Sequence, residues 1–235
     1  MSYMLIGGFD PNEKFGKIKE FLIKKAKNRH PKILYFPLAS KNKKSIINRF
    51  LSEFDDCSVK TVDLLKKVNK KSLICDIIDS CILFFDGGDS RFLFDYLTNN
   101  NLEYIFYTAQ KNNKIIAGVS AGAIIQSEFG LGDTDSFKDS NGHFYNFKMV
   151  KGLGLLDLTI CPHFNLSDRD IFFDYVKNYN LSGLAISNST AVYIDGSNLE
   201  VVKNVGSRPV YYFQKKDKTL ISLRENVLYD RKDLL

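Results

Sequence analysis

The chain has 235 residues, 44% of them hydrophobic, and a formal net charge of +6. The charge is uneven: residues 1–71 carry 17 basic and 7 acidic side chains, a net of +10, while 16 basic and 20 acidic side chains give the remainder a net of −4. No apolar run reaches the roughly 18 residues of a membrane span, and the lysines lack the aromatic partners of a nucleic-acid surface, so we expect no membrane and no nucleic acid as partners.

The cysteines and the first residues bear on the cellular compartment. Cys57, Cys75, Cys81 and Cys161 form no CxxC pair and have no histidine at zinc-site spacing, which predicts reduced, buried thiols and no metal site. The opening residues MSYMLIGGFD lack a basic leader and a long apolar segment. We therefore expect a cytoplasmic protein.

Strand and helix signals alternate through the first half of the chain. Asp10, Pro11 and Glu13 predict that a helix begins directly after the first strand. Near-continuous apolar strands separated by helices are typical of a parallel sheet covered on both faces. The expected strands are at residues 3–8, 32–39, 57–65, 81–88 and 114–119.

The second half of the chain changes character. Residues 129–150 are polar and rich in glycine and aspartate, which predicts a loop or a short hairpin. A strand at 158–164 and a helix at 167–179, capped by Ser167 or Asp168, should follow. Asp-Gly and Lys-Asp-Lys turns between later extended segments predict antiparallel hairpins. With no linker or internal repeat, we expect one domain over residues 1–235.

Ser120 lies where an apolar strand meets a helix. The stretch Gly118-Val-Ser-Ala-Gly122 matches a G-x-S-x-G elbow, in which small neighbours allow a sharp turn that exposes the serine oxygen. The backbone N–H of Ala121 then lies at a helix N-terminus, which favours an oxyanion. Gly88, at the end of another strand, is a second candidate donor. This pattern predicts a nucleophilic serine.

A serine hydroxyl needs a base, and the chain has three histidines. His30 precedes a strand, at the wrong end of the sheet, and His143 lies in the polar excursion. His163 follows a strand and the backbone-restricting Pro162. We therefore predict that His163 is the general base.

These residues resemble the peptidase E and cyanophycinase group of serine hydrolases, over most of the chain. The resemblance implies a three-layer α/β/α sandwich with a mainly parallel sheet, similar to class I glutamine amidotransferases. It also implies Ser120 as nucleophile, His163 as base, and the Gly88 and Ala121 amides as oxyanion hole. The matching segments are FFDGGD at 84–89, GVSAGA at 118–123, GLGLLDLTICPHF at 152–164 and LAISNSTAVYIDG at 184–196.

The third member of the triad stays open. Peptidase E members have an aspartate shortly after the serine, which corresponds to Asp135, with Asp133 as a competitor. The late motif of the family commonly carries a glutamate, and this chain has Asn188 near that place. An asparagine can also orient an imidazole. We rank Asp135 first, Asn188 second and Asp133 third.

The substrate is the finest part of the prediction. The resemblance implies cleavage of small peptides after an N-terminal aspartate, whose carboxylate Arg169 would bind; alternatively Arg169 faces solvent between two aspartates. The family's glycine motif usually reads GGGN, and here Asp86 and Asp89 flank the glycines and bear on which substrate end is tolerated. Side chains and amides suffice for this chemistry, so no cofactor is expected.

Three alternatives remain beside the dipeptidase. The chain could be a cyanophycinase-like isopeptidase, or another amidase or esterase. An ordinary α/β-hydrolase is disfavoured, because no histidine follows His163. A degenerate member that only binds a ligand is the alternative outside enzymes. The oligomeric state is not determined by the sequence, which is compatible with a homodimer.

Overall fold

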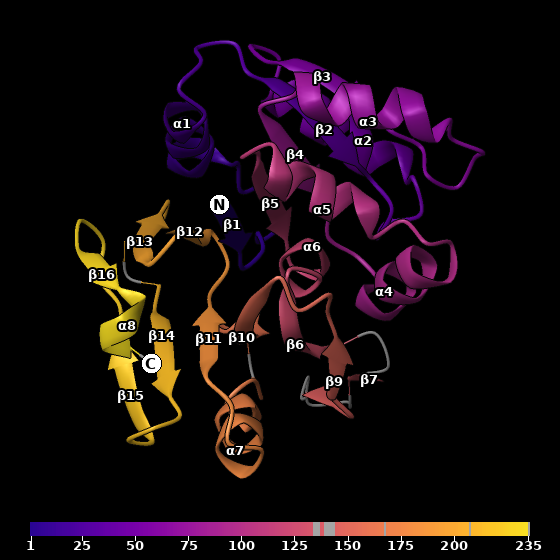
Figure 1. Cartoon of the computed structure of the whole chain (residues 1–235). Coiled ribbons are helices and arrows are strands. Elements are labelled where there is room, and N and C mark those ends of the chain that lie inside the picture. The colour runs from indigo at the N-terminus through magenta and orange to yellow at the C-terminus, as the bar shows by residue number, and fades with distance from the viewer. Residues whose placement is uncertain (134–136, 139–143, 167, 207, 235) are drawn as a thin grey trace.

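The computed structural model describes residues 1–133, 137–138, 144–166, 168–206 and 208–234 (Figure 1). Its larger sheet has eight strands, with a parallel half and an antiparallel half. The strand order is β16 (Leu228–Asp230), β13 (Asn198–Lys203), β12 (Thr190–Asp195), β1 (Ser2–Ile6), β5 (Ile115–Val119), β4 (Ile82–Phe85), β2 (Lys32–Phe36) and β3 (Ser58–Thr61).

Helices cover both faces of this sheet, because alternate residues of its buried strands point to opposite sides. In β2, Ile33 and Tyr35 join a cluster with α1 and α2, whereas Leu34 and Phe36 join a cluster with α3, α4 and α5. These helices are α1 (Gly16–Lys25), α2 (Lys44–Glu53), α3 (Lys70–Asp79), α4 (Ser90–Asn99) and α5 (Tyr104–Lys111).

A second sheet has six strands, of which β6, β10 and β11 run parallel. The expected C-terminal hairpins are confirmed but are divided: β12–β13 extends the first sheet and β14–β15 extends the second. The order is β15 (Thr219–Ser222), β14 (Val210–Gln214), β11 (Gly183–Ile186), β10 (Leu156–Cys161), β6 (Ser127–Gly132) and β9 (Lys148–Lys151). The remaining elements are the paired strands β7 (Phe137–Lys138) and β8 (Phe144–Tyr145), and the helices α6 (Ala121–Ile124), α7 (Ile171–Asn178) and α8 (Arg231–Leu234).

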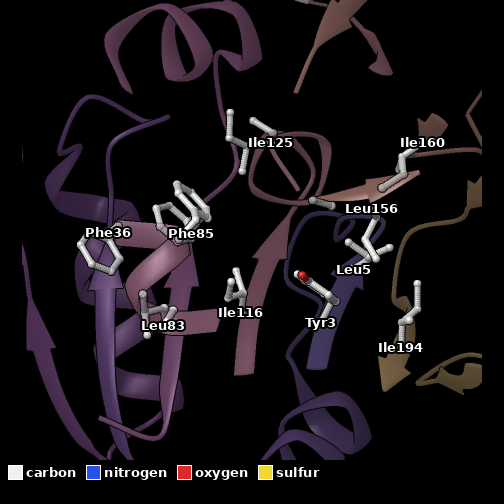
Figure 2. Close-up of a cluster of buried hydrophobic side chains, with 14 of the residues drawn as sticks. Tyr3, Leu5, Phe36, Leu83, Phe85, Ile116, Ile125, Leu156, Ile160 and Ile194 are labelled. Atoms are coloured by element: carbon white, nitrogen blue, oxygen red, sulfur yellow. The ribbon is translucent and has the colours of Figure 1, made fainter. Parts of the chain in front are cut away.

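One hydrophobic cluster joins the two sheets. Figure 2 shows Leu5 and Ile116 of the first sheet in the same cluster as Leu156 and Ile160 of the second. All four side chains are buried, as is Ile125 just after α6. The mixed α/β fold with helices flanking the sheets is the predicted class, and this shared core holds the strand ends of the two sheets together.

Several element boundaries differ from the predictions. The first helix begins at Gly16, because the backbone at Asp10 forms a single turn with Glu13 instead of a helix N-terminus. The segment 129–150, expected as a loop or a short hairpin, begins with residues 129–132 of β6, which pairs antiparallel with β9 and in which Leu131 is fully buried. Helix α7 begins at Ile171, after Asp168, while Ser167 lies outside the described residues. The helix α5 was not predicted at all.

The structure also bears on the expectations for the cysteines and for a membrane span. All four cysteines are free thiols, but Cys75 is exposed and only Cys161 is fully buried, so the expectation of four buried thiols was wrong. Cys75 lies on the outward face of α3, where a small apolar side chain costs little to leave in water. Within the described ranges, no helix has the length and apolar character needed to cross a membrane.

Candidate active site

Ser120 is the single residue between β5 and α6, and its backbone is strained. Its φ of 51° and ψ of −107° lie in a backbone region that residues other than glycine rarely adopt. Such a conformation costs on the order of 1–3 kcal/mol and persists only when the surroundings enforce it. The Ser120 N–H donates to the Ile6 carbonyl at 2.9 Å, which ties the turn to the end of β1.

The two glycines of the elbow leave no room for a side chain. A Cβ at Gly118 would lie 2.1 Å from the Gly122 carbonyl oxygen. A Cβ at Gly122 would lie 2.2 Å from the Phe85 carbonyl oxygen, at the end of β4. Both obstacles are backbone atoms, which cannot rotate away. The expectation that this turn requires small neighbours is therefore confirmed.

His163 reaches Ser120 from the second sheet. It follows β10, and its Nε2 lies 2.8 Å from Ser120 Oγ, within hydrogen-bond distance. Its own N–H donates to the Gly7 carbonyl at 3.0 Å, beyond the end of β1. A Cβ on Gly8 would lie 2.2 Å from His163 Cε1, so the imidazole ring packs directly against this glycine. The carboxyl ends of strands from both sheets thus meet at one place.

Asn188 contacts the other nitrogen of the imidazole. It lies where the chain passes from β11 in the second sheet to β12 in the first, and it is 2% exposed. Its Oδ1 is 2.6 Å from His163 Nδ1. Asp135, ranked first for this position, lies outside the described residues. Asp133 pairs instead with Arg169, at 2.6 Å.

A polar network continues beyond Asn188. The Asn188 Nδ2 donates to Asp10 Oδ1, and Arg208 donates to Asp10 Oδ2. Arg208 also donates to Glu13 at 3.0 Å, and Glu13 accepts from the Ser189 hydroxyl. Sequence reasoning missed these contacts because it assigned Asp10 and Glu13 to a helix cap. The only available signal was the position of Asp10 shortly after a strand that ends in two glycines.

The electrostatics favour a neutral imidazole. Burial, followed by the positive charge of Arg169, lowers the pKa of His163 from its ordinary value of 6.5. The hydrogen bond to Asn188 and the charges of Asp133 and Asp10 oppose that shift. A neutral imidazole at pH 7 has a free lone pair to accept the serine proton.

The candidate oxyanion donors are the N–H groups of Ala121 and of Gly88, in the loop after β4. A Cβ on Gly87 would lie 3.4 Å from Ser120 Cβ, so the loop after β4 packs against the serine. Gly88 has a φ of +151°, and a Cβ there would lie 2.3 Å from the Ala39 carbonyl oxygen. Ala121 is the first residue of α6, where the N–H groups have no partner within the helix. Ala121 directly follows Ser120, and Gly88 is the next residue of the loop that packs against the serine.

The two aspartates of the glycine motif are bonded within the protein. Asp86 is 3% exposed and accepts from the Ala39 and Ser40 amides at 2.9 and 3.2 Å. Burial raises the pKa of Asp86 to about 6. Asp89, predicted to bind substrate, accepts from the Phe92 N–H at 2.9 Å and so caps α4. Its other oxygen is 3.5 Å from Lys41.

Arg169 is buried, and its role in substrate binding stays a prediction. Its side chain is 1% exposed, so the solvent-facing alternative was wrong. The guanidinium lies over the Phe147 ring at 4.8 Å and pairs with Asp133. Its Nε and Nη1 have no hydrogen-bond partner among the described residues. The short turn at 168–170 folds this side chain inward instead of presenting it on the helix surface.

A cavity of about 330 Å³ adjoins Ser120 and His163. Its volume is at the lower end of the range for small-molecule sites. Most of its wall is aromatic or aliphatic, and Arg49 is the cation in it. Its residues are Gly8, Phe9, Phe15, Tyr35, Ile46, Arg49, Phe50, Phe84, Asp86, Gly87, Gly88, Val119, Ser120 and His163. Among the described residues, no group of three His, Cys, Asp or Glu side chains could hold a metal ion.

The sequence of this chain is similar to those of known peptidases. The model of peptidase family S51 matches residues 3–202. The uncharacterized peptidase YgaJ of Bacillus subtilis (strain 168) is 28% identical over 207 residues, which cover 86% of this chain and 85% of the relative.

Two solved structures share the fold. A peptidase from an acI-B1 Actinobacterium superposes with a TM-score of 0.73 at 20% identity, covering 97% of this chain and 96% of the other. A putative peptidase E protein from Listeria monocytogenes EGD-e gives a TM-score of 0.64 at 18% identity, covering 87% and 98% respectively. At these identities the two structures support the architecture alone.

Proposed function

This chain belongs to peptidase family S51, and we propose that it is a serine peptidase that hydrolyses small peptides through an acyl-enzyme. The observation that carries this proposal is the 2.8 Å hydrogen bond between His163 Nε2 and Ser120 Oγ. A strained backbone presents the hydroxyl, and a neutral imidazole accepts its proton. These are the components that nucleophilic acyl transfer requires.

The acylation step follows from this geometry. His163 Nε2 takes the hydroxyl proton while Ser120 Oγ attacks the carbonyl carbon of the scissile bond. The carbonyl oxygen becomes an oxyanion, which the N–H groups of Gly88 and Ala121 stabilise. Asn188 Oδ1 holds the imidazolium by its Nδ1–H. The imidazolium then gives the proton to the leaving amine as the C–N bond breaks.

Deacylation reverses the roles. A water molecule attacks the ester carbonyl, and His163 takes the proton of that water. The tetrahedral intermediate collapses, the Ser120 oxygen leaves and recovers its proton from the imidazolium, and the carboxylate product departs. Because the same groups act in both halves, loss of any of them should affect both steps.

The substrate side chain is proposed to be that of an N-terminal aspartate, as the resemblance implies. A carboxylate needs a cation, and Arg49 lines the cavity beside Ser120, with its side chain 44% exposed. Arg169 is almost fully enclosed and already paired. Arg49 is therefore the more accessible partner for an aspartyl carboxylate, although it also pairs with Glu53 at 3.0 Å and donates to the Glu13 carbonyl.

A second candidate is a peptide with an apolar residue before the cleaved bond. Phe9, Phe15 and Phe50 are among the aromatic side chains that line the cavity. A cavity of about 150 Å³ with apolar walls is known to hold a benzene ring, so about 330 Å³ accommodates an aromatic side chain. This alternative needs no cation.

The test is hydrolysis of a panel by the wild-type protein and by Ser120→Ala. The panel contains Asp-Leu, Phe-Leu, Ala-Leu, β-Asp-Arg and a p-nitrophenyl ester. We expect cleavage of Asp-Leu that is absent in Ser120→Ala, and labelling by a fluorophosphonate at Ser120 alone. Cleavage of β-Asp-Arg or of the ester alone would favour the isopeptidase or esterase alternative.

Arg49→Gln tests the choice of side chain. It should weaken cleavage of Asp-Leu more than that of Phe-Leu, because only the aspartyl carboxylate loses its ionic partner. Equal losses would remove Arg49 from substrate recognition. A folded wild-type protein that cleaves nothing and is not labelled at Ser120 would contradict the serine mechanism and favour a member that only binds a ligand.

A further inference from the structure

A carboxylate lies one hydrogen bond beyond the His163–Asn188 pair. Asp10 accepts from Asn188 Nδ2, while Oδ1 of the same amide lies 2.6 Å from His163 Nδ1. We propose that Asp10 is a positioning residue that sets the orientation of Asn188 and, through it, the tautomer of His163. The inference rests on the proposed serine mechanism, and it concerns a residue that touches neither the substrate nor the reacting atoms.

The argument starts from the chemistry of the two side chains. An ionised carboxylate only accepts hydrogen bonds, so Asp10 must face the NH₂ end of the Asn188 amide. The oxygen end then faces His163 and can only accept, which requires the proton of the neutral imidazole to be on Nδ1. Nε2 is left with a lone pair directed at the Ser120 hydroxyl. With the amide reversed, Nε2 would carry the proton and could not act as base.

Asp10 is itself held in place, so it can impose this orientation. Its two oxygens are divided between Asn188 and Arg208. Its own N–H donates to Glu13 at 2.9 Å. Although burial works against it, hydrogen bonds from the Ser189 hydroxyl and the Asp10 N–H, with the pairing to Arg208, lower the pKa of Glu13. Glu13 therefore stays charged and keeps Arg208 directed at Asp10.

The network also supplies a charge that Asn188 lacks. A neutral amide cannot stabilise an imidazolium by charge. Asp10 brings a negative charge one amide further away, from the loop after β1. The charged groups that act on His163 are Arg169, which opposes its protonation, and Asp133 and Asp10, which favour it. Asp10 therefore supplies, from one amide further away, part of the charge stabilisation that a carboxylate in direct contact with the imidazole would provide.

The first experiment compares Asp10→Asn with the wild type on the substrate found in the panel. An amide at this position can present either end, so it no longer enforces the orientation of Asn188. We expect kcat to fall roughly 10- to 100-fold, the range for lost orienting partners, with KM little changed. The acid limb of the kcat/KM profile should move to lower pH, because one favourable charge is removed from His163.

Asp63→Asn is the matched control. Asp63 also accepts from an asparagine side chain, that of Asn42, but neither residue lines the cavity. This variant should leave kcat and the pH profile unchanged. Loss of activity in both variants, in proportion to lost stability, would mean that Asp10 is only a structural residue.

The decisive variant exchanges the two side chains. Alone, Asn188→Asp brings two carboxylates together and should not improve on the wild type. Combined with Asp10→Asn, it returns a charge to the imidazole and should recover most of the lost kcat and shift the acid limb back to higher pH. A double variant no better than the worse single variant would overturn the inference.

Nitrogen-15 NMR of the imidazoles gives a readout that needs no substrate, and the chain has only three histidines to assign. We expect His163 to carry its proton on Nδ1 in the wild type and to show a mixture of tautomers in Asp10→Asn. An unchanged tautomer with unchanged kcat would reject the role of Asp10 while leaving the serine mechanism intact. A wild type that is not labelled at Ser120 would reject both.

Discussion

His163 has two sides, and they are built in different ways. On one side Ser120 is held by backbone, in a turn where Gly118 and Gly122 contact carbonyl oxygens with no spare space. On the other side Asn188 is held by side chains, through Asp10 and Arg208. The first side consists of consecutive residues, and the second is assembled from three distant segments of the chain.

This difference teaches which kind of precision each side needs. Ser120, the proposed nucleophile, must keep a strained backbone, and only close packing of rigid atoms enforces strain. His163, the proposed base, must keep one protonation state, and the direction of its hydrogen bonds selects the tautomer. We therefore expect substitutions on the serine side to damage folding first, and substitutions on the asparagine side to damage catalysis first.

The largest effect is expected for Gly122→Ala. The new methyl group would lie 2.2 Å from the Phe85 carbonyl oxygen, so β4 or the elbow must move. We expect a loss of about 3 kcal/mol of stability or more, measured by urea unfolding, and no activity. Gly206→Ala, where a Cβ meets nothing within 4 Å, is the control and should stay near wild type. Equal stability of the two variants would contradict the rigid elbow.

The same substitution at Gly8 should reduce activity more than stability. Its methyl group would meet the His163 ring, 2.3 Å from Nδ1, and a side chain can turn away where a carbonyl cannot. With a φ of +145° at this position, some strain is added as well. We expect kcat to fall roughly 100-fold, as for misplaced catalytic groups, with a smaller loss of stability than in Gly122→Ala. Kinetics and urea unfolding of the purified variant measure both quantities.

A moderate effect is expected for Arg208→Gln. The variant leaves Asp10 and Glu13 without their shared cation, so Asp10 is less firmly directed at Asn188. We expect kcat to fall roughly 10-fold, with a change in stability below about 1 kcal/mol, because the pair is partly exposed. Arg224→Gln is the control, since Arg224 is exposed and makes no ion pair with the described residues. A full loss of folding would show that Arg208 is mainly structural.

The smallest effect concerns pH. The proposed base is the neutral imidazole, so activity is lost as pH falls through the pKa of His163. Burial and Arg169 lower that pKa, which places the acid limb of kcat/KM below 6.5. Because the pKa of His163 is lower in the folded chain than in the unfolded chain, the unfolded chain binds the imidazole proton more tightly. His163 therefore contributes stability above pH 6.5 that is lost as pH falls. An acid limb above 6.5 would be inconsistent with the buried, neutral base.

Much of the first sheet could be predicted from the sequence. Its strands β1 and β4 are short apolar runs followed by glycines, and in β2 Leu34 and Phe36 alternate with Ile33 and Tyr35 as a sheet with two covered faces requires. The division of the strands into two sheets could not be predicted, and strand β6 at 127–132 was missed because it contains two glycines and leads into a polar segment. Local composition there is typical of a loop, and only pairing with β9 and β10 makes it a strand.

The candidate site also has a part that the sequence determined and a part that only the tertiary structure decided. The sequence by itself determined the elbow at Ser120, because a sharp strand-to-helix turn demands small residues at fixed spacing, and it pointed to His163, because few histidines were available. Only the tertiary structure decided that Asn188 contacts the imidazole, that Asp10 lies behind it and that Arg169 is buried. Those contacts depend on directions and distances, such as the 2.6 Å from Asn188 to His163, that arise when the strand ends of two sheets meet.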